Sequence, residues 1–327
     1  YGHNISECLQ SVEIFDGANF FLLSKKECQF AYRESIFKNK KWFIKAAGLA
    51  EGKGAIPAVN KLEVISAIEQ MSKFGKAGQI FVLEEWLEGE EFSMFAISDG
   101  KTFRIVGCAQ DYKRLYEGDM GPNTGGIGCN TPALVVDKNI YKQAELIVKT
   151  TLSGLTQEGR IYKGILYLGA IVVRGKVFVI EFNARWGDLE AEVVIPVIKN
   201  DMFEIGMAVA RSRLKTLRIK TDGRARVAVT GSLRQGVETR SRRLFGLNDA
   251  LKMKGISIYG TRVSRKNNKY FVSSGRLFHV VGEGETVIEA RMRVYEAMSL
   301  LHIEGDNLHY RTDIGWRDAE RLRQGGV

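Results

Sequence analysis

Glu181 and Asn183, which follow the apolar run 177–180, are the residues whose types and spacing point most directly to chemistry. Along a strand, side chains two residues apart point to the same side. The carboxylate and amide oxygens of this pair are therefore expected to converge, while Ile180 and Phe182 point to the other side, toward a core. The alternative is a strand that ends in a polar turn without a chemical role.

Arg185 and Asp188 come directly after this pair and add a guanidinium and a second carboxylate. Carboxylate and amide oxygens are ligands that hard divalent cations prefer, and a cation beside a guanidinium suits the binding of phosphate groups. Mg²⁺ with a nucleotide is the natural candidate for this segment.

A second segment that suits phosphate groups follows the short apolar strand expected at 41–45. Lys45 ends that strand, and Gly52, Lys53 and Gly54 lie in a glycine-rich loop whose backbone N–H groups can approach phosphate oxygens closely. The loop is not a Walker A loop, since Gly54 stands where Ser or Thr would be required. A mobile hairpin tip without a ligand is the alternative.

The acidic stretch 84–93 breaks one expected strand and starts another. Glu84, Leu87 and Glu91 offer a carboxylate, a backbone amide and a second carboxylate around this hinge. That set complements the amine and ring acceptor of adenine and the hydroxyls of ribose. A solvated acidic turn is the alternative reading.

The segment 110–128 is rich in glycine, with charged residues at its entry and a polar pair in its centre. We expect a long, structured loop, and loops of this length inside a compact domain usually have a function. The residues that could contact a substrate are Asp111, Lys113, Arg114, Asn123 and Thr124.

Periodicity predicts the elements that would position these residues. Residues 174–175 are expected to join two strands in a hairpin that presents Glu181, and Thr286 is expected to cap a helix as part of a capping box. Helices are expected at 61–74, 140–155, 202–211 and 287–301, and strands at 102–109, 163–173, 176–182, 225–231, 257–263, 270–273 and 277–281. The expected domains are a shortened N-terminal segment (1–40), a small lobe (41–110), a large lobe with the metal site (111–215) and a C-terminal domain (216–327).

The composition of the 327 residues, 45% hydrophobic and 26% charged, is that of a globular protein. The longest apolar run, 164–173, is shorter than the ~20 residues of a membrane-spanning helix, and no leader pattern begins the chain, so we expect no membrane partner and a cytoplasmic location. The net charge of +10 suits anionic substrates. Nucleic acid is not expected as a partner, because the basic clusters lack interleaved aromatic residues.

Four segments, 45–54, 84–93, 111–128 and 181–188, resemble in order and spacing the family of phosphoribosylamine-glycine ligases, ATP-grasp enzymes of purine synthesis. The stretch 121–126, Gly-Pro-Asn-Thr-Gly-Gly, is close to a signature of that family, and 309–315 resembles its C-terminal domain. The resemblance covers roughly residue 41 to the end of the chain. It implies an α+β fold, namely an ATP-grasp fold of two α+β lobes followed by a small C-terminal α/β-type sandwich domain.

The resemblance also implies an activity, the ATP-dependent joining of glycine to 5-phosphoribosylamine through a glycyl phosphate, which gives glycinamide ribonucleotide, ADP and phosphate. ATP and Mg²⁺ or Mn²⁺ are the implied cofactors. The roles it implies are as follows: Glu181 and Asn183 bind the metal; Lys45, Gly52, Lys53 and Gly54 clamp the nucleotide; Glu84, Leu87 and Glu91 bind adenosine; Asp111, Lys113, Arg114, Asn123 and Thr124 face the substrates; and Arg185 and Asp188 are catalytic.

The sequence departs from the family pattern at Ala47, where an aspartate is usual, and at Leu189 and Ala191, where proline and threonine are usual. The family's N-terminal domain is also missing before Lys41, so we expect a fragment or a shortened chain, with another chain as one source of that domain. Two alternatives stay open: another ATP-grasp carboxylate–amine ligase, and an incomplete, non-catalytic nucleotide-binding module.

Overall fold

The computed structural model describes residues 11–15, 20–24, 26–27, 41–48, 50 and 54–325. It divides into two compact units, Tyr1–Glu88 and Gly89–Val327. The four-part division expected from the sequence stays a prediction. The sequence also allows a helix at 25–37, and that segment falls almost entirely outside the described residues.

The first unit contains a three-stranded antiparallel sheet with strand order β4-β3-β5. Helix α2 begins after Asn60, whose side chain accepts a hydrogen bond from the backbone of Glu63, and it buries Ala67 and Met71 against Trp42 and Ile44. The strand expected at 41–45 and the helix expected at 61–74 are thus confirmed, with a short 3₁₀ segment, η1, completing the helical stretch. The bounds are β1 Ser11–Phe15, β2 Phe20–Ser24, β3 Trp42–Ala46, β4 Ala55–Ala58, α2 Lys61–Met71, η1 Ser72–Gly78 and β5 Phe81–Glu85.

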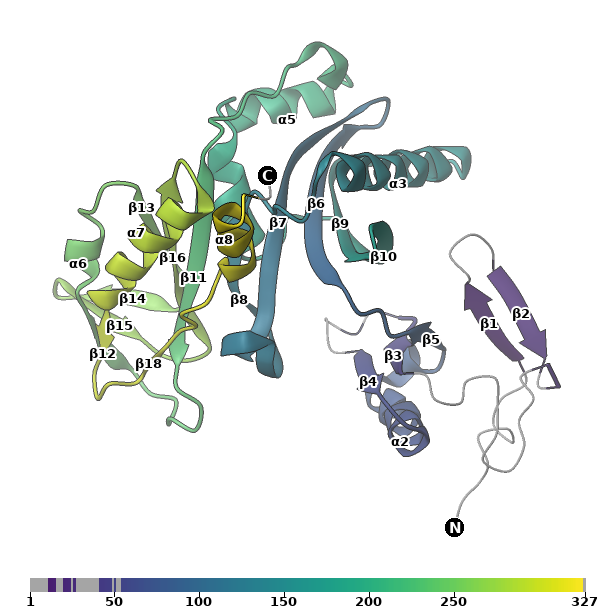
Figure 1. Cartoon of the computed structure of the whole chain (residues 1–327), viewed down its shortest axis with the longest axis horizontal. Coiled ribbons are helices and arrows are strands. Elements are labelled where there is room, and N and C mark those ends of the chain that lie inside the picture. Colours follow the sequence, from purple (N-terminus) through teal and green to yellow (C-terminus); the bar gives the residue numbers. More distant parts are fainter. Residues whose placement is uncertain are drawn as a thin grey trace. The chain divides into compact units, whose positions relative to one another are not determined.

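The second unit is organised around a nine-stranded sheet in which the strands β10-β9-β6-β7-β8-β11-β16-β13 are neighbours and β18 also pairs with β11 (Figure 1). All of its strand pairs are antiparallel. The bounds are β6 Glu90–Asp99, β7 Phe103–Tyr116, β8 Met120–Thr131, β9 Lys163–Val173, β10 Lys176–Asn183, β11 Ala225–Leu233, β13 Ile256–Gly260, β16 Arg276–Gly284 and β18 Leu308–His309.

Strand β6 is buried on both faces because helices cover both sides of this part of the sheet. Met94 packs with the buried stripe of α3 (Lys138–Gln157), while the adjacent Phe95 packs with residues near α4 (Glu190–Val194) and α5 (Met202–Ala210). This alternation follows from the two-residue period of a strand. Figure 1 shows α3 running beside β9 and β10.

The hairpin expected between the strands at 163–173 and 176–182 is confirmed as β9 and β10. Its two turn residues, Arg174 and Gly175, both have positive φ, +49° and +77°. Two such residues form the tight turn whose twist matches that of the paired strands.

The prediction of a long loop at 110–128 is wrong. These residues form the greater part of β7 and β8, two long paired strands joined by the short 3₁₀ turn Glu117–Asp119. Glycine in a strand also marks a close approach of another part of the chain. A Cβ on Gly128 would lie 2.2 Å from Ile314, so glycine is needed here for packing.

The C-terminal part of the unit adds β11, β16 and β13 to the same sheet and covers them with α7. Thr286 caps α7 by accepting a hydrogen bond from the backbone of Glu289, as expected. A second sheet has the strand order β14-β15-β12-β17. The remaining bounds are η3 Ile195–Val197, η4 Leu214–Thr216, β12 Arg242–Phe245, α6 Leu247–Ala250, β14 Val263–Lys266, β15 Lys269–Val272, α7 Val287–Ser299, β17 His302–Ile303 and α8 Trp316–Arg323.

Candidate functional site

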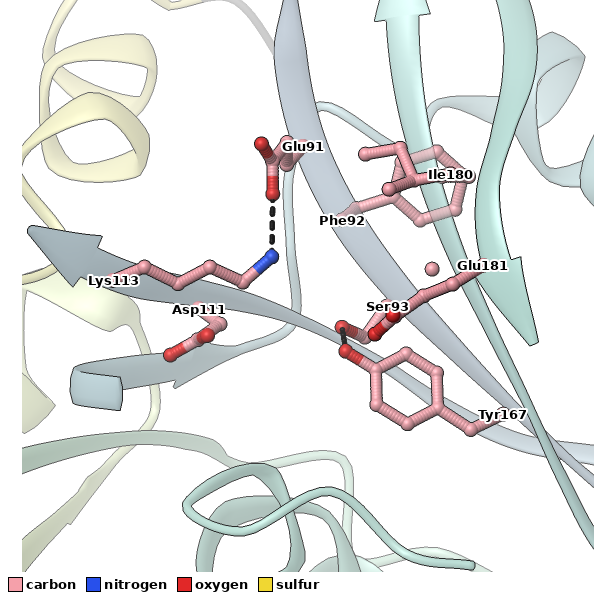
Figure 2. A pocket seen from close by; sticks show the side chains of 10 residues that line it. Glu91, Phe92, Ser93, Asp111, Lys113, Tyr167, Ile180 and Glu181 are labelled. Atoms are coloured by element: carbon pink, nitrogen blue, oxygen red, sulfur yellow. Dashed lines mark hydrogen bonds and ion pairs between the residues drawn. The ribbon is translucent and has the colours of Figure 1, made fainter. Parts of the chain in front are cut away.

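A polar pocket lies on the second unit, where β6, β7, β9 and β10 present side chains to one another (Figure 2). These four strands are consecutive neighbours in the sheet, so residues far apart in sequence meet on one surface. The residues that line the pocket are Glu91, Phe92, Ser93, Asp111, Lys113, Tyr167, Gly169, Ala170, Ile180 and Glu181.

Glu181 and Asn183 converge as the sequence predicts. The side-chain nitrogen of Asn183 donates a hydrogen bond to Glu181 Oε1 at 2.9 Å. Both side chains offer oxygen atoms to the same side of β10, and oxygen is the donor type that Mg²⁺ and Mn²⁺ favour. The donor set therefore fits the cation that the family resemblance implies.

The prediction that Ile180 and Phe182 point toward a core is wrong. The register of β10 against β9 shifts between Val179 and Glu181, so Ile180 forms a β-bulge and lines the pocket beside Glu181. Phe182 is 39% exposed instead of lying in a core. A bulge adds one residue to a strand and interrupts its alternation, which places Ile180 on the same side as Glu181.

Lys113 reaches across the pocket from β7, and its Nζ lies 2.7 Å from Glu91 Oε2 (Figure 2). Burial alone would lower the pKa of this ammonium, but the charges of Glu91 and Asp111 outweigh that effect and raise it. Lys113 is therefore a fixed positive charge that faces Glu181, suited to an anionic ligand. Glu91, expected to bind adenosine, makes an ion pair with this lysine.

Asp111 is a buried carboxyl beside Lys113. Burial, followed by the nearby charge of Glu190, raises the pKa of Asp111 to about 8. Its Oδ1 has no hydrogen-bond partner among the described residues. An orphaned acceptor at a pocket wall is a feature that a donor group on a ligand could satisfy.

A buried cluster missed by sequence reasoning supports this wall. Tyr167 donates a hydrogen bond to Glu190 Oε1 at 2.8 Å, and Ser93 Oγ lies 2.7 Å from the Tyr167 hydroxyl and 3.0 Å from Glu190 Oε1. Burial and the charge of Glu190 raise the pKa of Tyr167, so its hydroxyl stays protonated. Ser93 has the same strand phase as Glu91, which is the signal that could have identified it.

Asp188 is held by Arg276, another residue missed by sequence reasoning. Arg276 donates to both carboxylate oxygens of Asp188, at 2.5 and 3.2 Å, and to the backbone oxygen of Gly125 at 2.8 Å. Arg185 is exposed and bonds to the backbone oxygen of Trp186. Neither Arg185 nor Asp188 lines the pocket itself.

The polar residues of the β7–β8 hairpin hold its backbone together. Arg114 donates to the backbone oxygen of Gly121 at 2.8 Å, and Thr124 donates to the backbone oxygen of Lys113 at 2.9 Å. Asn123 pairs with Arg114 in the strand ladder. Of the five residues expected to contact substrates, Asp111 and Lys113 line the pocket, whereas Arg114, Asn123 and Thr124 do not.

The remaining expected residues belong to the first unit. Lys45 forms an ion pair with Glu84 across the adjacent strands β3 and β5. Gly54 accepts a hydrogen bond from the backbone of Ala46 at 2.8 Å, and Leu87 is half-buried. Gly52 and Lys53 lie outside the described residues.

Among the residues that the structure describes, no helix is both long and apolar enough to cross a membrane.

Comparison with known families gives two matches along the chain. Residues 7–191 match the phosphoribosylglycinamide synthetase ATP-grasp (A) domain, and residues 238–317 match the phosphoribosylglycinamide synthetase C domain. The first match begins well before residue 41, so the likeness extends further toward the N-terminus than the motifs indicate.

Individual relatives agree with these matches. A phosphoribosylamine–glycine ligase of Caldanaerobacter subterraneus is 35% identical, over 86% of this chain and 69% of its own length. The trifunctional purine biosynthetic protein adenosine-3 of Gallus gallus is 35% identical, and the chain spans 28% of it. The crystal structure of a phosphoribosylamine–glycine ligase from Thermotoga maritima superposes with a TM-score of 0.72 at 32% identity, over 83% of this chain and 68% of that one. These findings confirm the predicted α+β, ATP-grasp fold.

Proposed function

The chain belongs to the phosphoribosylglycinamide synthetase family, and on that premise we propose that it joins glycine to 5-phosphoribosylamine with the cleavage of ATP. The products are glycinamide ribonucleotide, ADP and phosphate, and the reaction belongs to de novo purine synthesis. A cytoplasmic location and small-molecule partners, without nucleic acid, are part of the same proposal.

The reaction needs an activated acid, because a glycine carboxylate is a poor electrophile. One carboxylate oxygen attacks the γ-phosphorus of ATP, the bond from that phosphorus to ADP breaks, and glycyl phosphate forms. The amine of phosphoribosylamine then attacks the carbonyl carbon, loses a proton, and displaces phosphate. Catalysis of this kind depends on positioning and on fixed charges.

Glu181 and Asn183 would hold the cation, Mg²⁺ or Mn²⁺. An ion held there would neutralise negative charge on the phosphate groups during transfer. Lys113 faces the same pocket with a charge that its carboxylate neighbours keep in place. Asp111 offers its unpaired Oδ1 to a donor group of the bound substrates.

The nucleotide would be bound by residues of the glycine-rich loop and of the acidic stretch 84–93. Lys45, Gly52, Lys53 and Gly54 are assigned to the phosphates, and Glu84 and Leu87 with Glu91 to adenosine. Arg185 and Asp188 are assigned to the glycine side of the site, and Arg114, Asn123 and Thr124 to the substrate side of the β7–β8 hairpin.

The observation that carries the proposal is the same-side pair of Glu181 and Asn183, joined by a hydrogen bond of 2.9 Å, with Glu181 lining a pocket that Lys113 also lines. The test is ADP release by the purified chain with Mg²⁺, measured with glycine and phosphoribosylamine together and with each omitted. Release that requires both supports the proposal. Turnover with a different acid or amine in a substrate screen would assign another ligase activity, and ATP binding without any turnover would favour a nucleotide-binding module.

A further inference from the structure

A second polar cluster lies beside the pocket and is formed by Asp188, Glu192 and His279. One ligand atom of each residue lies within 4.8 Å of the other two, and His279 Nε2 is 3.9 Å from Asp188 Oδ1. His279 is fully buried on β16. Its Nε2 has no hydrogen-bond partner among the described residues.

The other contacts of these residues leave acceptor capacity in the cluster. Arg276 binds Asp188, and Glu192 Oε2 accepts a hydrogen bond from the backbone of Leu189 at 3.1 Å. A carboxylate can accept about four hydrogen bonds, so both groups keep free lone pairs. Because the arginine offsets one of the two negative charges, the cluster has a net charge that suits one positive group.

His279 can complete the set as a neutral acceptor in one of its two tautomers. Its Nδ1 lies 2.9 Å from Thr230 Oγ1. When the ring proton is on Nδ1 and is donated to Thr230, the lone pair of Nε2 faces the carboxylates. Burial and the charge of Arg276 lower the pKa of His279 to about 4, which keeps the ring uncharged near neutral pH.

The spacing of the three acceptors leaves room for a cation larger than a bare Mg²⁺ or Zn²⁺ ion. Acceptors that each lie about 2.9 Å from one tetrahedral nitrogen are about 4.7 Å apart. Ligands bound to Mg²⁺ or Zn²⁺ at about 2.1 Å lie only about 3.0 to 3.4 Å from their neighbours. The one pair with a known separation, His279 Nε2 and Asp188 Oδ1, is 3.9 Å apart, wider than ligands of Mg²⁺ or Zn²⁺ and narrower than acceptors around an ammonium, and no pair exceeds 4.8 Å.

The cluster also adjoins the pocket where the proposed chemistry takes place. A Cβ on Gly126 would lie 3.1 Å from Asp111 Oδ1 and 3.5 Å from the backbone oxygen of Asp188. Asp111 lines the pocket and Asp188 belongs to the cluster, so one glycine separates the two sites.

We propose that Asp188, Glu192 and His279 form the subsite for the ammonium group of the amino acid substrate. This inference rests on the proposed function and names the residues that would select glycine over an acid without an ammonium group. The ammonium satisfies the orphaned His279 nitrogen, and it orients the carboxylate of the same small molecule toward the pocket. An acid without an ammonium group lacks this anchor.

The test measures glycine binding by calorimetry in the presence of Mg²⁺ and a non-hydrolysable ATP analogue, with glycolate as the matched acid that lacks the ammonium. Glu192→Gln and His279→Gln are compared with the wild type. Glu204→Gln and His302→Gln are the controls, because they make the same changes at exposed positions. Loss of a hydrogen bond to a charged group is expected to weaken glycine binding about ten- to hundredfold, with little change for glycolate.

An NMR measurement on the wild-type protein does not depend on whether the variants fold. With ¹⁵N-labelled histidine, glycine is expected to shift the Nε2 resonance of His279, and glycolate is not. The inference is overturned if both variants bind glycine with the affinity of the wild type, or if glycine does not shift the Nε2 resonance of His279. It is also overturned if the wild type binds Mn²⁺ without other ligands and both variants lose that Mn²⁺ binding. ADP release that depends on glycine and phosphoribosylamine, measured separately, shows whether the proposed function stands in each case.

Discussion

Arg276 donates two hydrogen bonds to the carboxylate of Asp188, at 2.5 and 3.2 Å, although 88 positions separate the two residues in sequence. The same guanidinium reaches the backbone oxygen of Gly125. Arg276 on β16 therefore holds both Asp188, which follows the expected metal pair, and the middle of the glycine-rich strand β8. The C-terminal part of the chain is thus an integral support of the site.

Replacing Arg276 by lysine should impair the reaction, because an ammonium cannot bind both carboxylate oxygens and a carbonyl in the planar geometry of a guanidinium. We expect kcat/KM for glycine to fall about tenfold or more, since hydrogen bonds to charged groups contribute about 1.5–3 kcal/mol. Steady-state ADP release measures it. Arg262→Lys, at an exposed position, is the control. Equal kinetics in the two variants would contradict the supporting role of Arg276.

Glu181→Gln should weaken the response to Mg²⁺, because an amide oxygen is a poorer ligand for a hard cation than a carboxylate. The Mg²⁺ concentration that gives half-maximal ATP turnover is expected to rise at least about tenfold. Chelation of the metal should abolish turnover in the wild type. Glu296→Gln, on the exposed side of α7, provides the comparison. A variant with the wild-type Mg²⁺ response would remove Glu181 from the metal site.

The protonation of Asp111 should make stability depend on pH. Burial raises its pKa from the usual 3.8 to about 8, so between these values the folded chain holds a proton that the unfolded chain has released. By linkage, this residue lowers the free energy of unfolding as pH rises through that range. Asp111→Asn should therefore gain stability relative to the wild type between pH 5 and pH 8.

Urea unfolding of both proteins at several pH values measures this difference. A difference in the free energy of unfolding that stays constant over the range would show that Asp111 has no raised pKa.

Tyr167→Phe removes the hydroxyl that joins Ser93 and Glu190 under the pocket. Because a buried carboxylate then loses a donor, the free energy of unfolding should fall by about 1–3 kcal/mol. Urea unfolding with an unchanged m-value would report this loss. Tyr141→Phe is a matched control, since the Tyr141 hydroxyl makes no hydrogen bond among the described residues. A loss no larger than that of the control would refute the role of the cluster.

Local patterns in the sequence predicted several parts of this structure correctly. The β9–β10 hairpin and the convergence of Glu181 with Asn183 depend on turn chemistry and on strand period, which neighbouring residues determine. The capped start of α7 at Thr286 is local for the same reason.

Other features depend on contacts between distant segments, so sequence patterns missed them. The bulge at Ile180 reverses the expected alternation, and the glycines of β8 indicate close packing in a strand instead of a loop. Arg276 and His279 reach the site only because β16 pairs with β11, which pairs with β8. No motif near either residue signals that placement.

The most direct test of the central claim follows the oxygen that leaves the glycine carboxylate. With glycine labelled with ¹⁸O in its carboxylate, the chain is incubated with ATP, Mg²⁺ and phosphoribosylamine, and the phosphate released is analysed by mass spectrometry. A glycyl phosphate intermediate predicts one ¹⁸O in each phosphate formed with the product. Unlabelled phosphate, or ADP release indifferent to glycine, would contradict the account.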